Sequence, residues 1–161
     1  VAFLHRYRES KPNPVDQYIV EVLTPFKILE SLAKNSRNSE LAVVLTSSPA
    51  ATKVAPDQDF QYHASKAAIE QLVRFSSVRF AENKMRTNGI NPGTYVYKER
   101  ASNFYKENPD ILKTAERQIP LGRIATVDEI AAVAMFLLSD QSSFINGTVI
   151  TIDGGHSNQV S

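Results

Sequence analysis

Apolar residues along this chain recur with the two periods that mark helices and buried strands. Between residues 15 and 34 they return every three or four positions, which predicts a helix that Pro25 kinks without ending. The run Leu41–Leu45 is apolar throughout, as in a parallel strand covered on both faces. A polar loop then leads to a second helical pattern over residues 62–81, whose predicted apolar stripe is Ala64, Ala67, Ala68, Leu72, Phe75 and Val78.

The second half of the chain continues this alternation. Strands are predicted at 87–91 and 149–152, in addition to a short one at Val1–Leu4. Between them, Asn108 and Pro109 predict a helix start, and Thr126 with Glu129 forms the pattern of a capping box. Strands that alternate with helices imply parallel βαβ units with right-handed crossovers. We therefore expect one α/β domain over residues 1–161.

Composition narrows the possible functions. The chain has 161 residues, a net charge of +1 and no cysteine. A near-neutral charge does not favour nucleic-acid binding, and no apolar run approaches the roughly 20 residues that cross a bilayer. Without thiols there is no disulfide frame, and the histidines lack partners at metal-ligand spacing. We expect a cytoplasmic protein with no metal, no membrane segment and no nucleic-acid partner.

The first candidate chemistry lies at the start of the second helix. Tyr62 and Lys66 are four residues apart, so their side chains share one helix face. An ammonium group beside a phenol favours the phenolate, and a tyrosine tuned in this way can exchange a proton with a carbonyl or alcohol oxygen. Ser48 follows the buried strand and is a candidate hydrogen-bond donor; Ser47 is the alternative, and either serine could simply cap the next turn.

An ordered series of motifs accompanies this pair. It comprises the strand that ends in Ser47-Ser48, Tyr62-x-x-x-Lys66, Asn88-Gly-Ile-Asn-Pro-Gly93, Pro120-Leu-Gly-Arg123 and Asp153-Gly-Gly155. Taken together, the series resembles the short-chain dehydrogenase/reductase family, and within it the members similar to ketoacyl-carrier-protein reductase. The resemblance spans about residues 14–155.

The resemblance implies an NAD(P)-dependent oxidoreductase that transfers hydride between nicotinamide and a carbonyl or alcohol substrate. Tyr62 would be the general acid/base, Lys66 would tune it and bind the nicotinamide ribose, and Ser48 would stabilise the substrate oxygen. Pro92, Gly93 and Tyr95 would lie against the nicotinamide. The cofactor is NAD or NADP, and the choice between them is not readable.

The resemblance also implies a fold: part of a doubly wound, Rossmann-type parallel sheet in three α/β/α layers. All six glycines lie at or after Gly89, so the glycine-rich turn that binds pyrophosphate has no place in the first 88 residues. We expect this chain to be the C-terminal half of the family's fold, an incomplete dinucleotide-binding domain and a fragment of a longer enzyme. The helices at 15–34 and 62–82 are those through which family members form homo-oligomers.

Two positions depart from the family pattern. Glu21 stands where the family has a catalytic asparagine, and it could accept a hydrogen bond, pair with Lys66 or be solvated. Tyr97 stands where a cofactor-binding threonine is usual, and it could stack on a ring or fill the space where the cofactor would lie.

The aromatic stretch 94–120 is either a substrate lid or a segment packed on its own domain. His63 is expected at the surface or an interface. The alternative function is a non-catalytic scaffold or regulatory subunit with the same fold.

Overall fold

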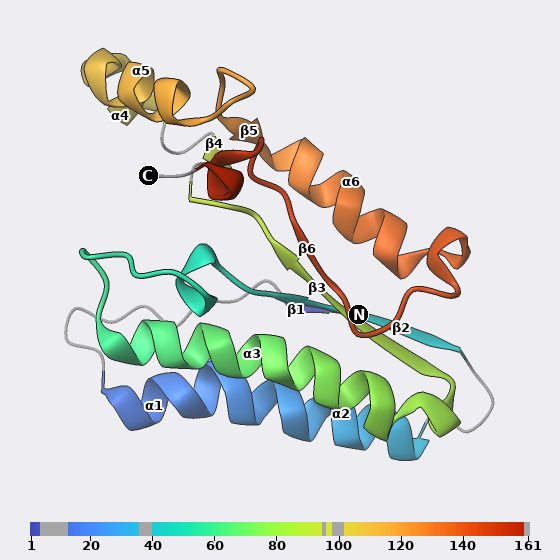
Figure 1. Ribbon diagram of the computed structural model, residues 1–161. Coiled ribbons are helices and arrows are strands. Elements are labelled where there is room, and N and C mark those ends of the chain that lie inside the picture. Colours follow the sequence, from blue (N-terminus) through green and yellow to red (C-terminus); the bar gives the residue numbers. More distant parts are fainter. Residues whose placement is uncertain (4–12, 36–39, 95, 98–101, 160–161) are drawn as a thin grey trace.

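The structure is a computed structural model that describes residues 1–3, 13–35, 40–94, 96–97 and 102–159. In these ranges a parallel sheet lies between two layers of helices (Figure 1). Its strands run in the order β1-β2-β3-β6, and all three neighbouring pairs are parallel. Their bounds are β1 (Ala2–Phe3), β2 (Leu41–Thr46), β3 (Met85–Asn91) and β6 (Val149–Thr151). The predicted α/β sheet and its strands are confirmed within a few residues.

One helical layer consists of α1 (Pro14–Tyr18), α2 (Thr24–Asn35) and α3 (Phe60–Arg79). A single π-helical turn, Ile19–Leu23, joins α1 to α2, and the Thr24 N–H donates to the carbonyl of Ile19 five residues back. Pro25 has no N–H to offer the carbonyl four residues earlier, so the regular α ladder cannot continue through this point. The helical path does continue past the proline as predicted, and its irregularity is this π turn.

The buried face of α3 differs from the predicted stripe. Phe75 and Val78 are 47% and 81% exposed, and Ala64 and Ala67 are exposed as well. The face that contacts the sheet carries several polar groups among its apolar ones: Ser65, Lys66, Ile69, Leu72, Val73, Ser76 and Ser77. Apolar periodicity located the helix, but of the predicted stripe only Ala68 and Leu72 face the core, because polar side chains occupy much of the buried face.

The other layer is α6 (Val127–Leu138), which begins with the predicted capping box between Thr126 and Glu129. The side chain of Arg86 on β3 donates to the carbonyls of Leu137, Ser139 and Ile145, and so ties the sheet to the far end of this helix. Within the described residues, the main body also contains 3-10 turns at Pro49–Ala51, Ala81–Asn83, Asp140–Ser142 and His156–Asn158.

A smaller unit projects from one end of the sheet, where Figure 1 draws α4 and α5 beyond the end of α6. It contains α4 (Ser102–Glu107), α5 (Pro109–Gln118) and the short parallel pair β4 (Val96–Tyr97) and β5 (Ala125–Thr126). The predicted helix start at Asn108 and Pro109 is confirmed, although the Asn108 side chain donates back to the Phe104 carbonyl at the end of α4 and caps no N–H of α5. Helix α4 was not predicted.

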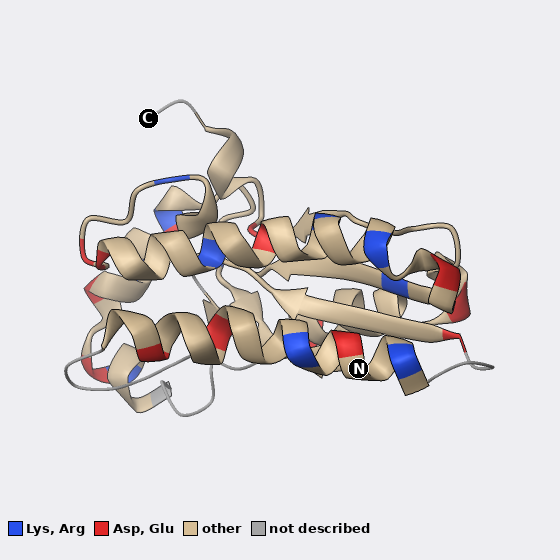
Figure 2. Cartoon of the chain, turned by 90° about the horizontal axis from the view of Figure 1, so that it is seen from below, with Lys and Arg blue, Asp and Glu red and all other residues tan. Residues whose placement is uncertain are grey.

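Two apolar clusters hold the layers together. The larger joins α2 and α3 to one face of the sheet through residues such as Leu29, Val43 and Val73. The second joins α6 to the other face around Val44, Ile90 and Leu137. Acidic and basic side chains are interspersed along the helices on the face drawn in Figure 2. No helix in the described ranges has the length and apolar character needed to cross a membrane.

Candidate active site

The candidate residues lie at one edge of the sheet. Strand β2 ends at Thr46 and β3 at Asn91, and the register pairs Thr46 with Ile90, so both strands end at the same level. Ser48 and Gly93 each come two residues after one of these strand ends. Helix α3 begins at the same edge, because it packs against the 3-10 turn that follows β2. In open α/β sheets, ligands bind in the crevice at this carboxyl edge.

Tyr62 and Lys66 share one face of the first turns of α3. The ammonium nitrogen of Lys66 lies 5.5 Å from the centre of the Tyr62 ring. Lys66 is 3% exposed, whereas Tyr62 is half-buried and so accessible from solvent. The structure therefore brings together a buried cation and a partly open phenol, as the four-residue spacing predicts.

Glu21 is the charged partner of Lys66. Its Oε2 lies 3.1 Å from Lys66 Nζ, and the side chains of Glu21 and Lys66 are 0% and 4% exposed. Glu21 belongs to the π turn, so the two charges come from different elements that pack against each other. Of the interpretations open from sequence, solvation of Glu21 is wrong and pairing with Lys66 is confirmed.

The two serines after β2 have different surroundings. Ser47 is buried, and its hydroxyl donates to Glu70 Oε1 at 2.9 Å, so its proton is already in use. Ser48 is half-buried, and its hydroxyl oxygen accepts from the Ala50 N–H at 3.3 Å, which leaves its own proton for another acceptor. Ser48 thus caps the next turn and still offers a donor at the sheet edge. Sequence reasoning did not foresee Glu70 as the partner of Ser47.

The turn after β3 has a compact backbone. The Gly93 N–H donates to Asn91 Oδ1 at 3.1 Å, and Gly93 has a positive φ of 71°. A Cβ at this position would lie 2.7 Å from Cβ of Asp153, so a larger residue would not fit. Pro92 and Gly93 therefore form a tight turn beside Asp153. Tyr95, the other residue predicted to lie against the cofactor, is outside the described residues.

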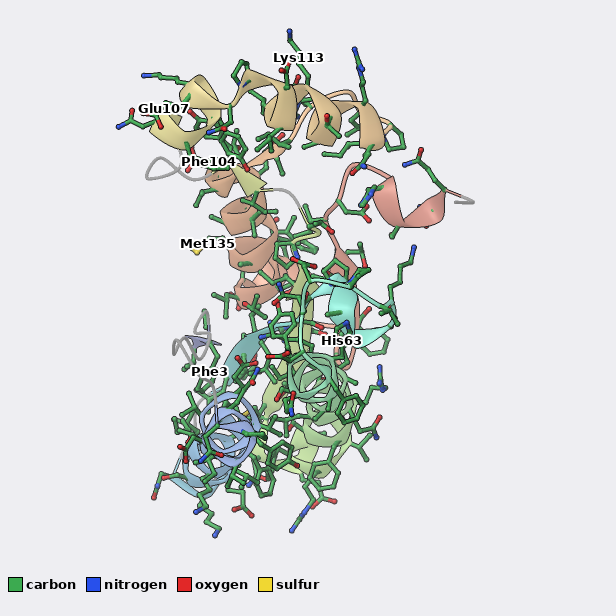
Figure 3. The ribbon with its side chains drawn as sticks, turned by 90° about the vertical axis from the view of Figure 1, so that its left-hand side faces the viewer. Phe3, His63, Phe104, Glu107, Lys113 and Met135 are labelled. Carbon is green, nitrogen blue, oxygen red and sulfur yellow. The ribbon has the colours of Figure 1, made fainter. Side chains whose placement is uncertain are left out.

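Tyr97 stacks on a ring of this chain. Its ring lies 5.8 Å from that of Tyr105, with the planes 21° apart. Both rings pack against a small apolar cluster of Ala115, Ile119 and Ile124. These contacts join the described parts of the stretch 94–120 to one another and to Ile124, and Phe104 on α4 is 50% exposed (Figure 3).

His63 is half-buried, and both of its ring nitrogens contact backbone groups of this chain. Its Nε2 accepts from the Ala55 N–H at 2.9 Å, and its Nδ1 lies 2.8 Å from the carbonyl oxygen of Asp59. Since a carbonyl only accepts, Nδ1 carries the proton. His63 thereby ties the loop before α3 to the helix start, beside the turn that follows β2 (Figure 3). The sequence gave no signal for this contact.

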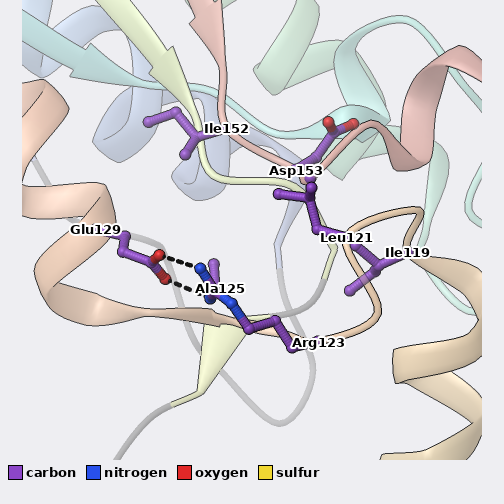
Figure 4. Close-up of a pocket in the computed structure, with 8 residues that line it drawn as sticks. Ile119, Leu121, Arg123, Ala125, Glu129, Ile152 and Asp153 are labelled. Carbon is purple, nitrogen blue, oxygen red and sulfur yellow. Dashed lines mark hydrogen bonds and ion pairs between the residues drawn. The ribbon is translucent and has the colours of Figure 1, made fainter.

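A separate pocket of about 90 Å³ lies where β6 ends and α6 begins (Figure 4). Arg123 donates to both carboxylate oxygens of Glu129, and these bonds, together with one from the Thr126 N–H, lower the pKa of Glu129 to about 2. Two of the charged side chains on its wall, Arg123 and Glu129, thus pair with each other, and the third, Asp153, accepts hydrogen bonds from the backbone of the last turn. The volume is well below the roughly 300–1,000 Å³ of small-molecule sites. None of Ser48, Tyr62 and Lys66 lines it.

The last turn is organised by Asp153. Burial opposes ionisation of this carboxyl, but hydrogen bonds from Ser157 and from the Gly155 N–H outweigh it and lower the Asp153 pKa. Lys53, from the loop before α3, donates to the carbonyl of Ser157 at 2.6 Å. The turn therefore packs beside the sheet edge, and its Asp153 carboxylate is hydrogen-bonded within the turn itself. Among the described residues, no three potential metal ligands come together.

Comparison with known proteins identifies the family of this chain. A family model described as enoyl-(acyl carrier protein) reductase matches residues 9–157. L-xylulose reductase of Caenorhabditis elegans is 30% identical over 98% of this chain and 63% of its own length. Oxidoreductase UcpA of Salmonella typhimurium is 38% identical over 95% of this chain and 59% of its own. The chain thus spans about three fifths of the length of these relatives.

Solved structures share the fold. A short chain dehydrogenase family protein from Francisella tularensis is 29% identical, with a TM-score of 0.73 over 91% of this chain and 62% of its own. A 4-hydroxyisoleucine dehydrogenase mutant complexed with NADH and succinate has a TM-score of 0.85 at 24% identity, over 99% of this chain and 68% of its own. The sheet, the motif series and the family match agree: this chain belongs to the short-chain dehydrogenase/reductase family.

Proposed function

We propose that this chain is part of an NAD(P)-dependent oxidoreductase that interconverts a carbonyl and an alcohol by hydride transfer. The observation that carries the proposal is the Tyr62–Lys66 pair, with a buried ammonium 5.5 Å from the ring of a half-buried phenol. Because the chain spans about three fifths of its relatives' length, we propose that the natural protein is longer and that residues 1–161 form the C-terminal half of its dinucleotide-binding fold.

The proposed chemistry divides among three side chains. The Tyr62 hydroxyl gives a proton to the developing alkoxide during reduction and takes one from the alcohol during oxidation. The free proton of Ser48 donates to the same oxygen and stabilises its charge. The Lys66 ammonium favours the phenolate of Tyr62 and offers its remaining N–H donors to the ribose of the nicotinamide nucleotide.

The donor set fits the nicotinamide end of the cofactor. An ammonium and a hydroxyl stand at the carboxyl edge of a parallel sheet, and the turn of Pro92 and Gly93 would lie against the ring. A nicotinamide cofactor supplies or accepts the hydride when bound. A structural neighbour, a gluconate 5-dehydrogenase from Burkholderia cenocepacia, was solved in complex with NADP and tartrate, and the 4-hydroxyisoleucine dehydrogenase mutant with NADH, so NAD and NADP both remain candidates.

We further propose that the protein forms a homo-oligomer through α2 and α3. The outer faces of these helices carry apolar side chains that are substantially exposed, among them Ile28 at 40%, Phe75 at 47% and Val78 at 81%. The rings of Phe26 and Phe75 lie 6.1 Å apart, edge to face, and join the two helices into one surface. A large apolar patch of this kind favours a partner, here a second copy of the chain.

Nicotinamide fluorescence tests the cofactor proposal. Mixing the natural-length protein with NADH or NADPH is expected to change the emission, and Lys66→Ala is expected to weaken binding about 10- to 100-fold, the effect of losing a charged hydrogen bond. Lys27→Ala, which removes an exposed lysine from α2, is the matched control. Circular dichroism verifies that each variant is folded. If neither nucleotide changes its emission with the wild-type protein, the non-catalytic scaffold becomes the better interpretation.

A further inference from the structure

We propose that Glu70 is a positioning residue of this site: its carboxylate holds the end of β2 and so fixes Ser48 relative to Tyr62 on α3. The inference rests on the proposed function, because Ser48 and Tyr62 are the side chains that would act on the substrate oxygen. It deepens that function by adding a residue that acts through Ser48 and not on the substrate itself.

The first support is the hydrogen bond that joins Ser47 to Glu70. The buried Ser47 hydroxyl donates to Glu70 Oε1 at 2.9 Å, and the Glu70 side chain is only 13% exposed. A hydroxyl forms a stronger bond with a carboxylate than with a neutral acceptor. The second oxygen of Glu70 lies 4.0 Å from Nη1 of the exposed Arg74, a pair that contributes little by comparison. The bond to Ser47 is therefore the main contact of this carboxylate with another element.

The second support is the main chain on either side of this bond. The Ser47 N–H donates to the carbonyl of Ile90 on β3 at 2.8 Å, so Ser47 is held to the sheet by its backbone and to α3 by its side chain. Ser48 follows across one planar peptide unit. Its carbonyl accepts from the Ala51 N–H and its hydroxyl from the Ala50 N–H. The place of Ser47 thus determines that of Ser48 and of the turn it caps.

The third support is the position of Glu70 on α3. Tyr62, Lys66 and Glu70 follow one another at intervals of four residues, so they occupy neighbouring positions on one side of the helix. Glu70 therefore attaches the end of β2 to the helix face that carries the two other proposed functional side chains. The turn after β2 packs on the same helix (Figure 1).

A second attachment to α3 lies at the far end of this segment. The Ala55 N–H donates to His63 Nε2 at 2.9 Å. The segment 47–55 is thus tied to α3 at both ends, with Ser48 between the two attachments. Loss of the bond at Glu70 would free the end next to Ser48, while the bond at His63 keeps the rest of the segment in place.

The consequence for the proposed reaction follows from this anchoring. Without the Glu70 carboxylate, the Ser47 hydroxyl is left buried without its acceptor, and the end of β2 loosens as the hydroxyl seeks another partner. Ser48 would then point at the substrate oxygen for a smaller fraction of the time, and a misplaced donor stabilises the developing charge less well. Tyr62 and Lys66 belong to α3 itself and keep their places.

Amide hydrogen exchange followed by NMR tests the anchor without cofactor or substrate. In Glu70→Ala, exchange at Ser47, Ala50 and Ala51 is expected to be about tenfold faster, the effect of losing one hydrogen bond to a charged group. Alanine is as good a helix former as glutamate, so α3 itself should persist. Arg74→Ala keeps the bond to Ser47 and is the matched control, with rates equal to those of the wild type. Unchanged rates in Glu70→Ala overturn the proposal.

Two further variants keep this test decisive if Glu70→Ala does not fold. Ser47→Ala breaks the same bond from its other end and is expected to speed exchange at Ala50 and Ala51 in the same way; wild-type rates there overturn the proposal. Glu70→Gln keeps an acceptor oxygen and is expected to restore at least part of the protection. A glutamine variant that exchanges as fast as the alanine variant would contradict the anchoring role.

Turnover of a small diketone by the natural-length protein tests the consequence for Ser48. Glu70→Ala is expected to lower kcat about tenfold, a part of what a donor to a developing oxyanion contributes, with the KM for the nucleotide near that of the wild type. In a Ser48→Ala background, Glu70→Ala is expected to lower kcat no further, because the residue that it positions has lost its hydroxyl. An equal loss of kcat in both backgrounds overturns the role through Ser48.

The two measurements separate this proposal from the proposed function. Exchange that responds as expected, in a protein that reduces no carbonyl compound with either nucleotide, counts against the proposed function alone. Exchange that does not respond to Glu70→Ala, in an active enzyme, counts against the role of Glu70 alone.

Discussion

Replacing Tyr62 with phenylalanine is expected to lower the turnover of a small diketone by about 10²- to 10⁴-fold, the range over which a general acid contributes to a rate. The substitution removes the hydroxyl that would give its proton to the substrate oxygen. It keeps the ring beside Lys66, so the site should retain its shape. Nucleotide binding is expected to persist, because in the proposed site Lys66 supplies the donor to the ribose.

The measurement is the loss of reduced nicotinamide absorbance in the natural-length protein. Tyr18→Phe provides the matched control, since Tyr18 lies on α1 and is 43% exposed. The control is expected to react at the wild-type rate. Equal rates for Tyr62→Phe and the wild type would show that another group supplies the proton.

The second large effect concerns folding. Lys66→Met leaves the Glu21 carboxylate buried without its cation, and removal of one partner from a buried ion pair typically lowers the free energy of unfolding by about 3–5 kcal/mol. The double variant Glu21→Leu with Lys66→Met replaces both charges by apolar groups and is expected to recover most of that loss. The destabilisation thus arises from the stranded charge more than from the lost contact.

Urea unfolding measures the free energy of unfolding of the wild type, of Lys66→Met and of the double variant. Lys27→Met, at an exposed position on α2, is the control and is expected to change the free energy of unfolding by no more than about 0.5 kcal/mol. A loss below about 1 kcal/mol in Lys66→Met would mean that Glu21 finds solvent or another partner. A double variant no more stable than the single one would show that the stranded Glu21 carboxylate is not the source of the destabilisation.

Much of the fold could be predicted because, in these elements, the local sequence pattern agrees with the burial that the fold requires. The continuous apolar run at residues 41–45 became a central strand of the sheet, and Thr126 and Glu129 formed the predicted capping box. The outward face of α3 shows where such rules fail. Phe75 and Val78 continue the apolar period but lie on the exposed face, because Lys66 and Ser76 occupy the buried one. Periodicity alone does not tell which face of a helix carries a functional charge.

The candidate site could be predicted in part for a related reason. The spacing of Tyr62 and Lys66 fixes their shared face within one helix, so sequence is sufficient to place them together. The pairing of Glu21 with Lys66, like that of Ser47 with Glu70, joins separate elements. These contacts depend on how the π turn and the end of β2 pack on α3, which no local pattern encodes. The role of Glu21 was therefore open until the packing was known.

Transfer of a labelled hydride tests the central claim most directly. The natural-length protein is supplied with NADH or NADPH that carries deuterium at the transferable position, together with a diketone, and the alcohol product is analysed by mass spectrometry. The account predicts deuterium on the new carbinol carbon with at least one of the two nucleotides, and its loss in Tyr62→Phe. An alcohol that forms without deuterium, or no alcohol with either nucleotide, would contradict it.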